Sequence, residues 1–250
     1  ARVALAVRDE PVLALQSVTN LTLRGLIFEE SQGDGLTVTD GFGVTIENCV
    51  FRNLRRRAII VRGGAGNRIL ACDIRDTGTG GVLLSGGDRK TLTPAGHTLE
   101  DSIIRNFSVH QLTYASALHL EGVGNAARHN FFADAPHQAV SVSGNDHLFE
   151  YNIVSNVCAC SDDAAAFYKG RNPSCRGNVI RYNLWRDIGS PRGHGNAAVY
   201  FDDGDGGELV FGNIFYRCGD PGKGSFGTVF SHGGHDNRAE NNIFVECKRA

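Results

Sequence analysis

The chain contains no methionine, only six prolines and a single tryptophan among its 250 residues. None of its apolar runs approaches the ~18 residues of a membrane-spanning helix, so we expect no membrane partner. The formal net charge of −2 provides no excess of basic side chains for a phosphate backbone, so we expect no nucleic-acid partner. No secretory leader is visible, and the missing initiating methionine leads us to expect a longer protein with further domains.

Glycine, by contrast, is abundant at 32 residues, and hydrophobic residues make up 41% of the chain. Frequent glycine favours many turns, and no stretch of about ten or more residues has a helical pattern. The hydrophobic content is enough for one continuous core. We therefore expect an all-β chain that folds as a single domain over residues 1–250.

One short phrase recurs along the sequence: a polar or small residue followed by bulky apolar residues, as in VTIENCVF, LFEYNIV, VIRYNLW and LVFGNIF. Successive copies are 22 to 31 residues apart. Between them lie alternating stretches that end at glycine, such as GVLLSGG and AVSVSGN, which are typical of a strand followed by a turn. The polar or small anchor residues are Gly25, Cys49, Cys72, Ser102, Asn130, Asn152, Asn183, Asn213 and Asn242.

Two or three short strands in each repeat predict a right-handed parallel β-helix of about nine coils. Neighbouring coils of such a solenoid lie ~4.8 Å apart, so equivalent side chains stack. We expect the consecutive asparagine anchors to form a hydrogen-bonded ladder. Cys218 and Cys247 each follow their anchor at the same distance, and we expect them to stack as thiols. A doubly wound α/β sheet would need helices, and a propeller would need blades of ~40 residues.

The strand positions that face outward change character along the chain. Aligning the strands by their closing glycine places these residues in one outward column: Thr39, Arg62, Ser85, Glu121, Ser143, Lys169, Asp202 and His232. A parallel column contains His119 and Tyr200. Histidine, tyrosine and carboxylate side chains side by side are typical of a polar binding cleft. The alanines of DDAAAFY would either make room for a ligand or pack beneath a covering loop.

The register of one strand has two solutions. If Phe167 points inward, Tyr168 and Tyr200 stack on the outside as a platform for a sugar ring, and the phrases AAFY and AAVY favour this arrangement. The glycine alignment favours the opposite one. Tyrosine suits an exposed position because its ring can pack while its hydroxyl finds a partner.

Five runs occur in order in the second half of the chain: GVGNAARHNFFADAPHQAVSVSGNDHLFEYN, DDAAAFYKGRN, RGNVIRYNLWRDIG, VYFDDGDGG and HDNRAENNIFVECK. Through them the chain resembles the right-handed β-helix proteins of glycoside hydrolase family 141, most strongly from Gly122 onward. The resemblance implies a carbohydrate-active enzyme, since that family includes α-L-fucosidase and xylanase activities. It also implies two catalytic aspartates, at Asp163 or its neighbour Asp162 and at Asp202 or its neighbour Asp203.

Further residues at motif positions of that family are His137, His147, Tyr168, Arg171 and Tyr200. The chain departs from the family pattern in three places. Ala165 stands where glycine is usual, Asn172 and Pro173 stand where an acidic and an aromatic residue are usual, and DGDGG replaces a serine–glycine pair. These departures concern the substrate rather than the fold.

We therefore predict a secreted or periplasmic, bacterial-type glycoside hydrolase that needs no cofactor and acts on a plant- or algal-type polysaccharide or oligosaccharide. Hydrolysis needs one carboxyl group as acid and another as base or nucleophile. In the expected register Asp163 lies about six positions from Asp202, roughly 20 Å along an extended strand, so this pair requires a local bend. The predicted catalytic residues are Asp163, Asp202 and Asp203. The predicted substrate-binding residues are His119, Glu121, His137, Tyr168, Lys169, Arg171, Tyr200 and His232.

Two alternatives use other chemistry. The run DDGDGGE resembles a short calcium loop with Asp202, Asp203 and Asp205 as oxygen ligands, and calcium would favour a polysaccharide lyase. In a lyase, Lys169 or Arg171 would abstract a proton from a uronate, and Tyr200 or His232 would do so without metal. The elimination product would absorb ultraviolet light. A β-helix that binds glycans without cleaving them is the other alternative, and it needs no matched pair of carboxylates.

Overall fold

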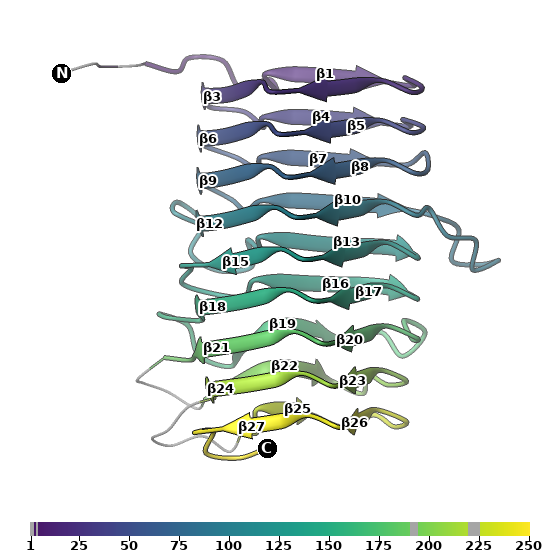
Figure 1. Cartoon of the computed structure of the whole chain (residues 1–250), viewed down its shortest axis with the longest axis vertical. Helices are drawn as coiled ribbons and strands as arrows, with labels where there is room; N and C mark the ends of the chain where they lie inside the picture. Colours follow the sequence, from purple (N-terminus) through teal and green to yellow (C-terminus); the bar gives the residue numbers. More distant parts are fainter. Residues whose placement is uncertain (1–2, 4, 191–194, 220–225) are drawn as a thin grey trace.

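The computed structural model describes residues 3, 5–190, 195–219 and 226–250. These residues form three parallel β-sheets of nine strands each, in which every strand pairs with the equivalent strand of the next coil. Figure 1 shows the coils stacked along one axis, from the N-terminal coil at the top to the C-terminal coil at the bottom. The predicted nine-coil parallel β-helix is confirmed. The described residues include no helix that is long and apolar enough to cross a membrane.

Each coil contributes one strand to each sheet. The first sheet consists of β1 (Leu13–Gln16), β4 (Leu36–Thr39), β7 (Ile59–Arg62), β10 (Val82–Gly86), β13 (Leu118–Val123), β16 (Val140–Asn145), β19 (Ala164–Gly170), β22 (Asn196–Asp202) and β25 (Val229–Ser231). The second sheet consists of β2 (Thr22–Arg24), β5 (Thr45–Glu47), β8 (Arg68–Leu70), β11 (Thr98–Glu100), β14 (Ala126–Arg128), β17 (Leu148–Glu150), β20 (Val179–Arg181), β23 (Leu209–Phe211) and β26 (Arg238–Glu240). The third sheet consists of β3 (Ile27–Ser31), β6 (Val50–Leu54), β9 (Asp73–Thr77), β12 (Ile103–Phe107), β15 (Phe131–Ala133), β18 (Ile153–Val157), β21 (Leu184–Ile188), β24 (Ile214–Cys218) and β27 (Ile243–Val245).

Apolar residues face the inside of each coil because side chains alternate between the two faces of a strand. One inward column of the third sheet holds Phe132, Val154, Trp185, Phe215 and Phe244 in consecutive coils. The ring of Trp185 lies 6.1 Å from that of Phe215, which lies 5.1 Å from that of Phe244. Stacked rows of this kind join the coils into one continuous core.

The predicted asparagine ladder lies at the turn between the second and third sheets. The Oδ1 atom of Asn183 accepts hydrogen bonds from the backbone N and from Nδ2 of Asn152, at 2.8 and 3.2 Å. Asn213 accepts the equivalent bonds from Asn183, both at 3.0 Å. Since the backbone N–H groups at this turn are buried, the side chains satisfy donors that would otherwise lack a partner.

One anchor residue lies at a different position from the one predicted. The anchor predicted at Gly25 lies instead at Leu26, whose carbonyl accepts a hydrogen bond from the backbone N of Val50, the first residue of β6.

All seven cysteines are free. Cys218 is buried, and Cys247 packs against the core one coil later, as predicted for stacked thiols.

A second polar ladder, which we did not predict from the sequence, runs inside the turn between the first and second sheets. It consists of Asn67, His97, Asn125, His147, Asn178, Glu208 and Asn237. Each side chain after Asn67 accepts a hydrogen bond from the backbone N of the ladder residue one coil earlier, as His147 Nδ1 does from Asn125 at 3.1 Å. Burial lowers the pKa of His147 to about 4, so its neutral ring can accept this bond. His147 therefore stabilises the fold.

Candidate active site

β19 and β22 each contain an irregular step, a point at which the side chains stop alternating between the two faces of the strand. This step decides which side chains lie on the outer face of the first sheet. Two consecutive residues of each strand point into the core: Ala166, Phe167, Ala198 and Val199. After this step Tyr168 faces outward, in register with Tyr200 and Phe230. The register that AAFY and AAVY favour is therefore the one present, and the glycine alignment is wrong by one position at β19. The predicted exposed platform does not form, because the rings of Tyr168 and Tyr200 meet edge to face at 5.5 Å and Tyr200 is only 3% exposed.

Asp202, the last residue of β22, lies at the centre of the site. Its Oδ2 atom accepts a hydrogen bond from the Tyr168 hydroxyl at 2.8 Å, and its Oδ1 atom accepts one from the Tyr200 hydroxyl at 2.9 Å. The Nδ1 atom of His232, one coil later, lies 3.0 Å from the same Oδ1. Only 6% of Asp202 is exposed, so these groups rather than water surround its carboxylate.

The surroundings of Asp202 favour its charged form. Burial raises the pKa of Asp202, but hydrogen bonds from Tyr168, His232 and Tyr200 outweigh it, and the net pKa lies below that of an ordinary aspartate. Burial and the adjacent carboxylate raise the pKa of Tyr168 and that of Tyr200. Both phenols therefore remain protonated donors, and Asp202 is a carboxylate at neutral pH.

Asp203, Arg171 and His232 border this carboxylate. The Oδ2 atom of Asp203 lies 3.1 Å from Nε of Arg171, and another guanidinium nitrogen of Arg171 lies 3.9 Å from Oδ2 of Asp202. Nδ1 of His232 lies 3.5 Å from Oδ1 of Asp203. Arg171 and His232 have largely exposed side chains. A ligand that reaches Asp202 would therefore contact a cation, an imidazole and a second carboxylate.

A pocket of about 510 Å³ opens beside these groups. It is lined by Asp163, Arg171, Tyr200, Asp202, Asp203, Phe226, Phe230 and His232. The strand partner of Asp202 is Gly170, so the register separates Asp163 from Asp202 by seven residues. A bend at residues 162–163, with a φ of 50° at Asp163, precedes β19. Both aspartates line the same pocket despite the offset in register.

Of the two adjacent aspartates before β19, Asp163 is the one that lines the pocket. Oδ1 of Asp162 instead accepts a hydrogen bond from the backbone N of Gly195 at 2.8 Å. That bond ties the starts of β19 and β22 together. Asp162 therefore ties the loop to the next coil, and Asp163 is the member of the pair that lines the pocket. The catalytic role of Asp163 stays a prediction.

Two aromatic residues of the pocket, Phe226 and Phe230, were not among the predicted site residues. Phe230 occupies the strand position one coil after Tyr200, so its place beside the tyrosine could have been predicted from the repeat. Phe226 precedes β25 in a loop without a repeat pattern, so its place could not. The Phe226 ring lies 4.3 Å from that of Phe230 and 5.3 Å from that of Tyr200. Ala165 and Ala197 are fully buried in the same cluster. The small residues therefore pack beneath rings and do not form an open floor.

Lys169 contradicts its prediction as a substrate-binding residue. It pairs with Phe201 and faces the inside of the coil, because the irregular step moves it to the opposite face of β19. Only 1% of its side chain is exposed, and its amine forms ion pairs with Asp205 and Glu208. Lys169 therefore cannot contact a sugar or abstract its proton.

The calcium loop considered from the sequence does not form with its three expected ligands. Asp205 is buried against Lys169 and is separated from the outer face. Asp202, Asp203 and His232 do have ligand atoms within 4.8 Å of one another. However, both oxygens of Asp202 already accept hydrogen bonds from phenols. A metal ion at this group would have to compete with those donors, and the predicted lack of a cofactor stays a prediction.

His119 and Glu121 lie on the outer face of the first sheet, but outside the pocket. They belong to β13, three strands from β22, or roughly 14 Å at ~4.8 Å per strand. Nε2 of His119 lies 3.4 Å from Oε1 of Glu121, and Arg62 lies 3.8 Å from the other Glu121 oxygen. Their role in binding a longer glycan stays a prediction.

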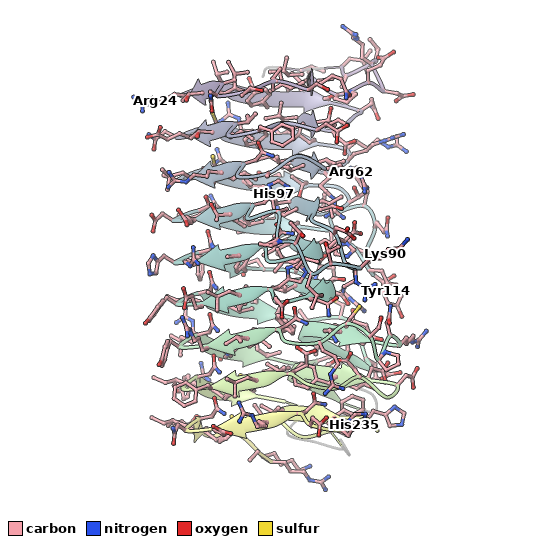
Figure 2. The ribbon with its side chains drawn as sticks, turned by 90° about the vertical axis from the view of Figure 1, so that its right-hand side faces the viewer. Arg24, Arg62, Lys90, His97, Tyr114 and His235 are labelled. Atoms are coloured by element: carbon pink, nitrogen blue, oxygen red, sulfur yellow. The ribbon has the colours of Figure 1, made fainter. Side chains whose placement is uncertain are left out.

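His137 is buried, contrary to its prediction as a residue that contacts substrate. It is 5% exposed, and the ring of Tyr114 lies 4.9 Å from its own. Burial lowers the pKa of His137, so its ring is neutral. Figure 2 shows Tyr114 projecting on the same side of the molecule as Arg62 and Lys90. Tyr114 itself is 73% exposed, and its ring packs against that of His137.

The stacked parallel coils and the outward carboxylate site define a β-helix protein of the solenoid class. The chain matches the family model described as "Right handed beta helix region" over residues 12–114 and 116–250, and it belongs to this family. The predicted right-handed parallel β-helix is thereby confirmed at the level of the family. No curated protein sequence matches the chain.

Solved structures with the same fold are similar to this chain at low sequence identity. A glycoside hydrolase aligns over 85% of this chain and 38% of its own, with 14% identity and a TM-score of 0.61. The A-module of the mannuronan C-5 epimerase AlgE6 from Azotobacter vinelandii aligns over 91% of this chain and 65% of its own, with 10% identity and a TM-score of 0.60. The surface protein and adhesin PfbA of Streptococcus pneumoniae aligns over 98% and 82%, with 12% identity and a TM-score of 0.52. At these identities the likeness concerns the fold.

Proposed function

We propose that the protein is a glycoside hydrolase whose active site is the pocket around Asp202. The observation that carries this proposal is a buried carboxylate, held in its charged form by two tyrosines and a histidine, in a pocket lined by two further carboxylates. Hydrolysis of a glycosidic bond needs two carboxyl groups in different protonation states. The resemblance to glycoside hydrolase family 141 and the fold shared with a solved glycoside hydrolase agree with this reading.

Asp202 is suited to act as the base or nucleophile, because its lowered pKa keeps it ionised. Asp163 is the better candidate for the acid. Among the described residues, no hydrogen bond or ion pair of its side chain is found, whereas Asp203 pairs with Arg171 at 3.1 Å. A sugar bound in the pocket would displace water from Asp163, and a carboxyl group in a water-free pocket is suited to act as the acid.

The aromatic side of the pocket is suited to a sugar ring. Phe226, Phe230 and Tyr200 form a cluster with ring centroids between 4.3 and 5.3 Å apart. Apolar faces of a pyranose can pack against such rings, while Arg171 and His232 offer hydrogen-bond donors to hydroxyl groups. A pocket with one apolar wall and one charged wall thus fits a carbohydrate better than a purely apolar ligand.

The proposed activity can be tested with a panel of plant and algal polysaccharides and their oligosaccharides. We expect at least one glycan to release new reducing ends without a gain in ultraviolet absorbance. Both signals should be read from the same reaction, because elimination produces an absorbing unsaturated uronate and hydrolysis does not. Glycan binding without any new reducing end would contradict the hydrolase proposal and favour a non-catalytic β-helix.

A lyase or epimerase acting on uronates is the second candidate. The exposed guanidinium of Arg171 beside the carboxylates favours it, because it offers a cation to the acidic group of a uronate. An epimerase module has a similar fold. The raised pKa of Tyr168 and that of Tyr200 weigh against either phenol as the base, and Lys169 is buried. His232 would then be the base, and the products of a lyase would absorb ultraviolet light.

Replacing Tyr168 with phenylalanine should change the pH dependence of the reaction. The substitution removes one hydrogen bond to the charged form of Asp202, so the pKa of Asp202 rises. The acid limb of the kcat/KM profile should move to higher pH by about one unit, as expected for one charge-assisted hydrogen bond.

The matched control for this substitution is Tyr151→Phe. Tyr151 is half-exposed and stacks on Tyr182 at 5.2 Å, away from the pocket. The pH profile of kcat/KM of Tyr151→Phe should coincide with that of the unmodified protein. An acid limb that stays in place in Tyr168→Phe would mean that another group controls it.

A further inference from the structure

A buried cluster of one ammonium and two carboxylates lies behind the proposed site. The side chains of Lys169, Asp205 and Glu208 are at most 1% exposed. The Lys169 amine donates to Asp205 Oδ1 and to the carbonyl oxygen of Cys175, at 2.6 Å in the latter case, and lies 2.9 Å from Oε1 of Glu208. Glu208 also accepts a hydrogen bond from the backbone N of Asn178, as part of the second polar ladder.

The position of Lys169 does not require a charge. Val142 follows Ser141, the partner of Tyr168, so Leu120 and Val142 precede Lys169 in the inward column, and Phe201 follows it. Packing alone would therefore favour an aliphatic or aromatic residue here. Replacing a buried ion pair with apolar residues is often neutral or stabilising, so the cluster is poorly explained by fold stability. A role in fixing a particular geometry explains it better.

The cluster joins three segments that carry the proposed site. Lys169 lies directly after Tyr168 in β19. Cys175 belongs to the loop that begins with Arg171, and Asp205 and Glu208 belong to the turn that follows Asp202. The backbone N of Asp205 also bonds to the carbonyl oxygen of Asp202 at 3.2 Å. One buried ammonium therefore holds together the elements that present Tyr168, Arg171 and the two carboxylates.

We propose that Lys169, with Asp205 and Glu208, is a positioning device that sets the distance between Asp202 and its hydrogen-bond donors. The three residues touch no ligand themselves. Their effect on turnover rests on the proposed function, but their effect on the geometry around Asp202 does not. Removing the ammonium leaves two buried carboxyl groups without a cation, so they either take up protons or draw the turn that carries them towards water. Either response breaks the ion pairs that hold this turn to β19.

The decisive variants are Lys169→Met and the charge-free triple variant Lys169→Met/Asp205→Asn/Glu208→Gln. Burial raises the pKa of Asp205 and raises that of Glu208 to about 7. The interior therefore favours the uncharged carboxyl groups, and asparagine and glutamine resemble these forms. The triple variant therefore keeps the volume of the cluster while removing its ion pairs. It provides the test if Lys169→Met alone does not fold.

The primary measurement is the carbon-13 titration of the Asp202 carboxyl group, assigned with Asp202→Asn, at a temperature where near-ultraviolet circular dichroism shows native packing. We expect the pKa of Asp202 to rise towards an ordinary aspartate value, by about one unit, in both variants, because its donors are no longer held in place. On any glycan that the protein cleaves, kcat should fall by roughly 10- to 100-fold with KM changed less than about twofold.

Two results would overturn the proposal. The first is a folded Lys169→Met protein whose Asp202 titrates as in the unmodified protein. The second is a folded triple variant with unchanged Asp202 titration, which would make the cluster structural only. Because the titration needs no substrate, a protein that cleaves no glycan would contradict the proposed function without affecting this test. Conversely, a kcat loss with an unchanged Asp202 titration would contradict the positioning role alone.

Discussion

Asp202→Asn is expected to lower kcat/KM by about 10³-fold or more while the protein remains folded. General acid–base or nucleophilic groups contribute about 10²- to 10⁴-fold, and the amide removes the charge that the tyrosines and histidine hold in place. Asparagine keeps the shape of the side chain, so the fold around it can persist. The loss should therefore appear in kcat, measured as reducing ends released from the cleaved glycan, with KM nearly unchanged.

Asp101→Asn is the matched control for this experiment. Asp101 is exposed at the turn before β12, on the opposite side of the coil from the first sheet, and its backbone φ of 50° is one that asparagine adopts readily. Its activity should equal that of the unmodified protein. Asp163→Asn should reduce kcat as well if Asp163 is the acid. An Asp202→Asn protein with more than about a tenth of normal kcat/KM would remove Asp202 from the chemistry.

Asn183→Ala is expected to destabilise the fold by about 3 kcal/mol, since each buried polar group left unsatisfied costs about 1–3 kcal/mol. The substitution removes the acceptor used by the backbone N and Nδ2 of Asn152, and the donor to the carbonyl oxygen of Phe149. In a chain of this size, each kcal/mol lowers Tm by about 2–4 °C, so Tm should fall by about 6–12 °C. Thermal unfolding followed by far-ultraviolet circular dichroism measures this shift.

Asn172→Ala separates the effect of the ladder from that of losing any asparagine. Asn172 is exposed in the loop after β19, and its Oδ1 accepts bonds only from the backbone N and hydroxyl of Ser174 among the described residues. Its Tm should change by less than about 2 °C, as for an ordinary surface substitution. Equal shifts for Asn183→Ala and Asn172→Ala would mean that the ladder contributes nothing specific to stability.

The repeating phrases made the fold and the first ladder predictable. Strand and turn signals at regular intervals specify where each coil turns, and the spacing between parallel strands then brings equivalent residues into contact. For that reason the order of residues along the chain is enough to assign Asn152, Asn183 and Asn213 to one stack. The second ladder was missed because its members, such as His97 and Glu208, differ chemically and occupy irregular turns.

The composition of the site was predictable in part for the same reason. Asp202, Tyr200 and His232 follow from strands that keep the common register, and the structure places them together. Their catalytic and binding roles stay predictions. Phe226 belongs to no repeated phrase, so its place in the pocket could come only from the path of the loop before β25.

By itself the sequence determined the stack: strands short enough to repeat, glycine-rich turns between them, and anchors that align from coil to coil. The tertiary structure alone decided which side chains of β19 face outward. The two consecutive inward residues, Ala166 and Phe167, interrupt the period of two, and a shift of one position exchanges the faces of every residue that follows. That shift brings Tyr168 to Asp202 on the surface and buries Lys169 with Asp205 inside the coil.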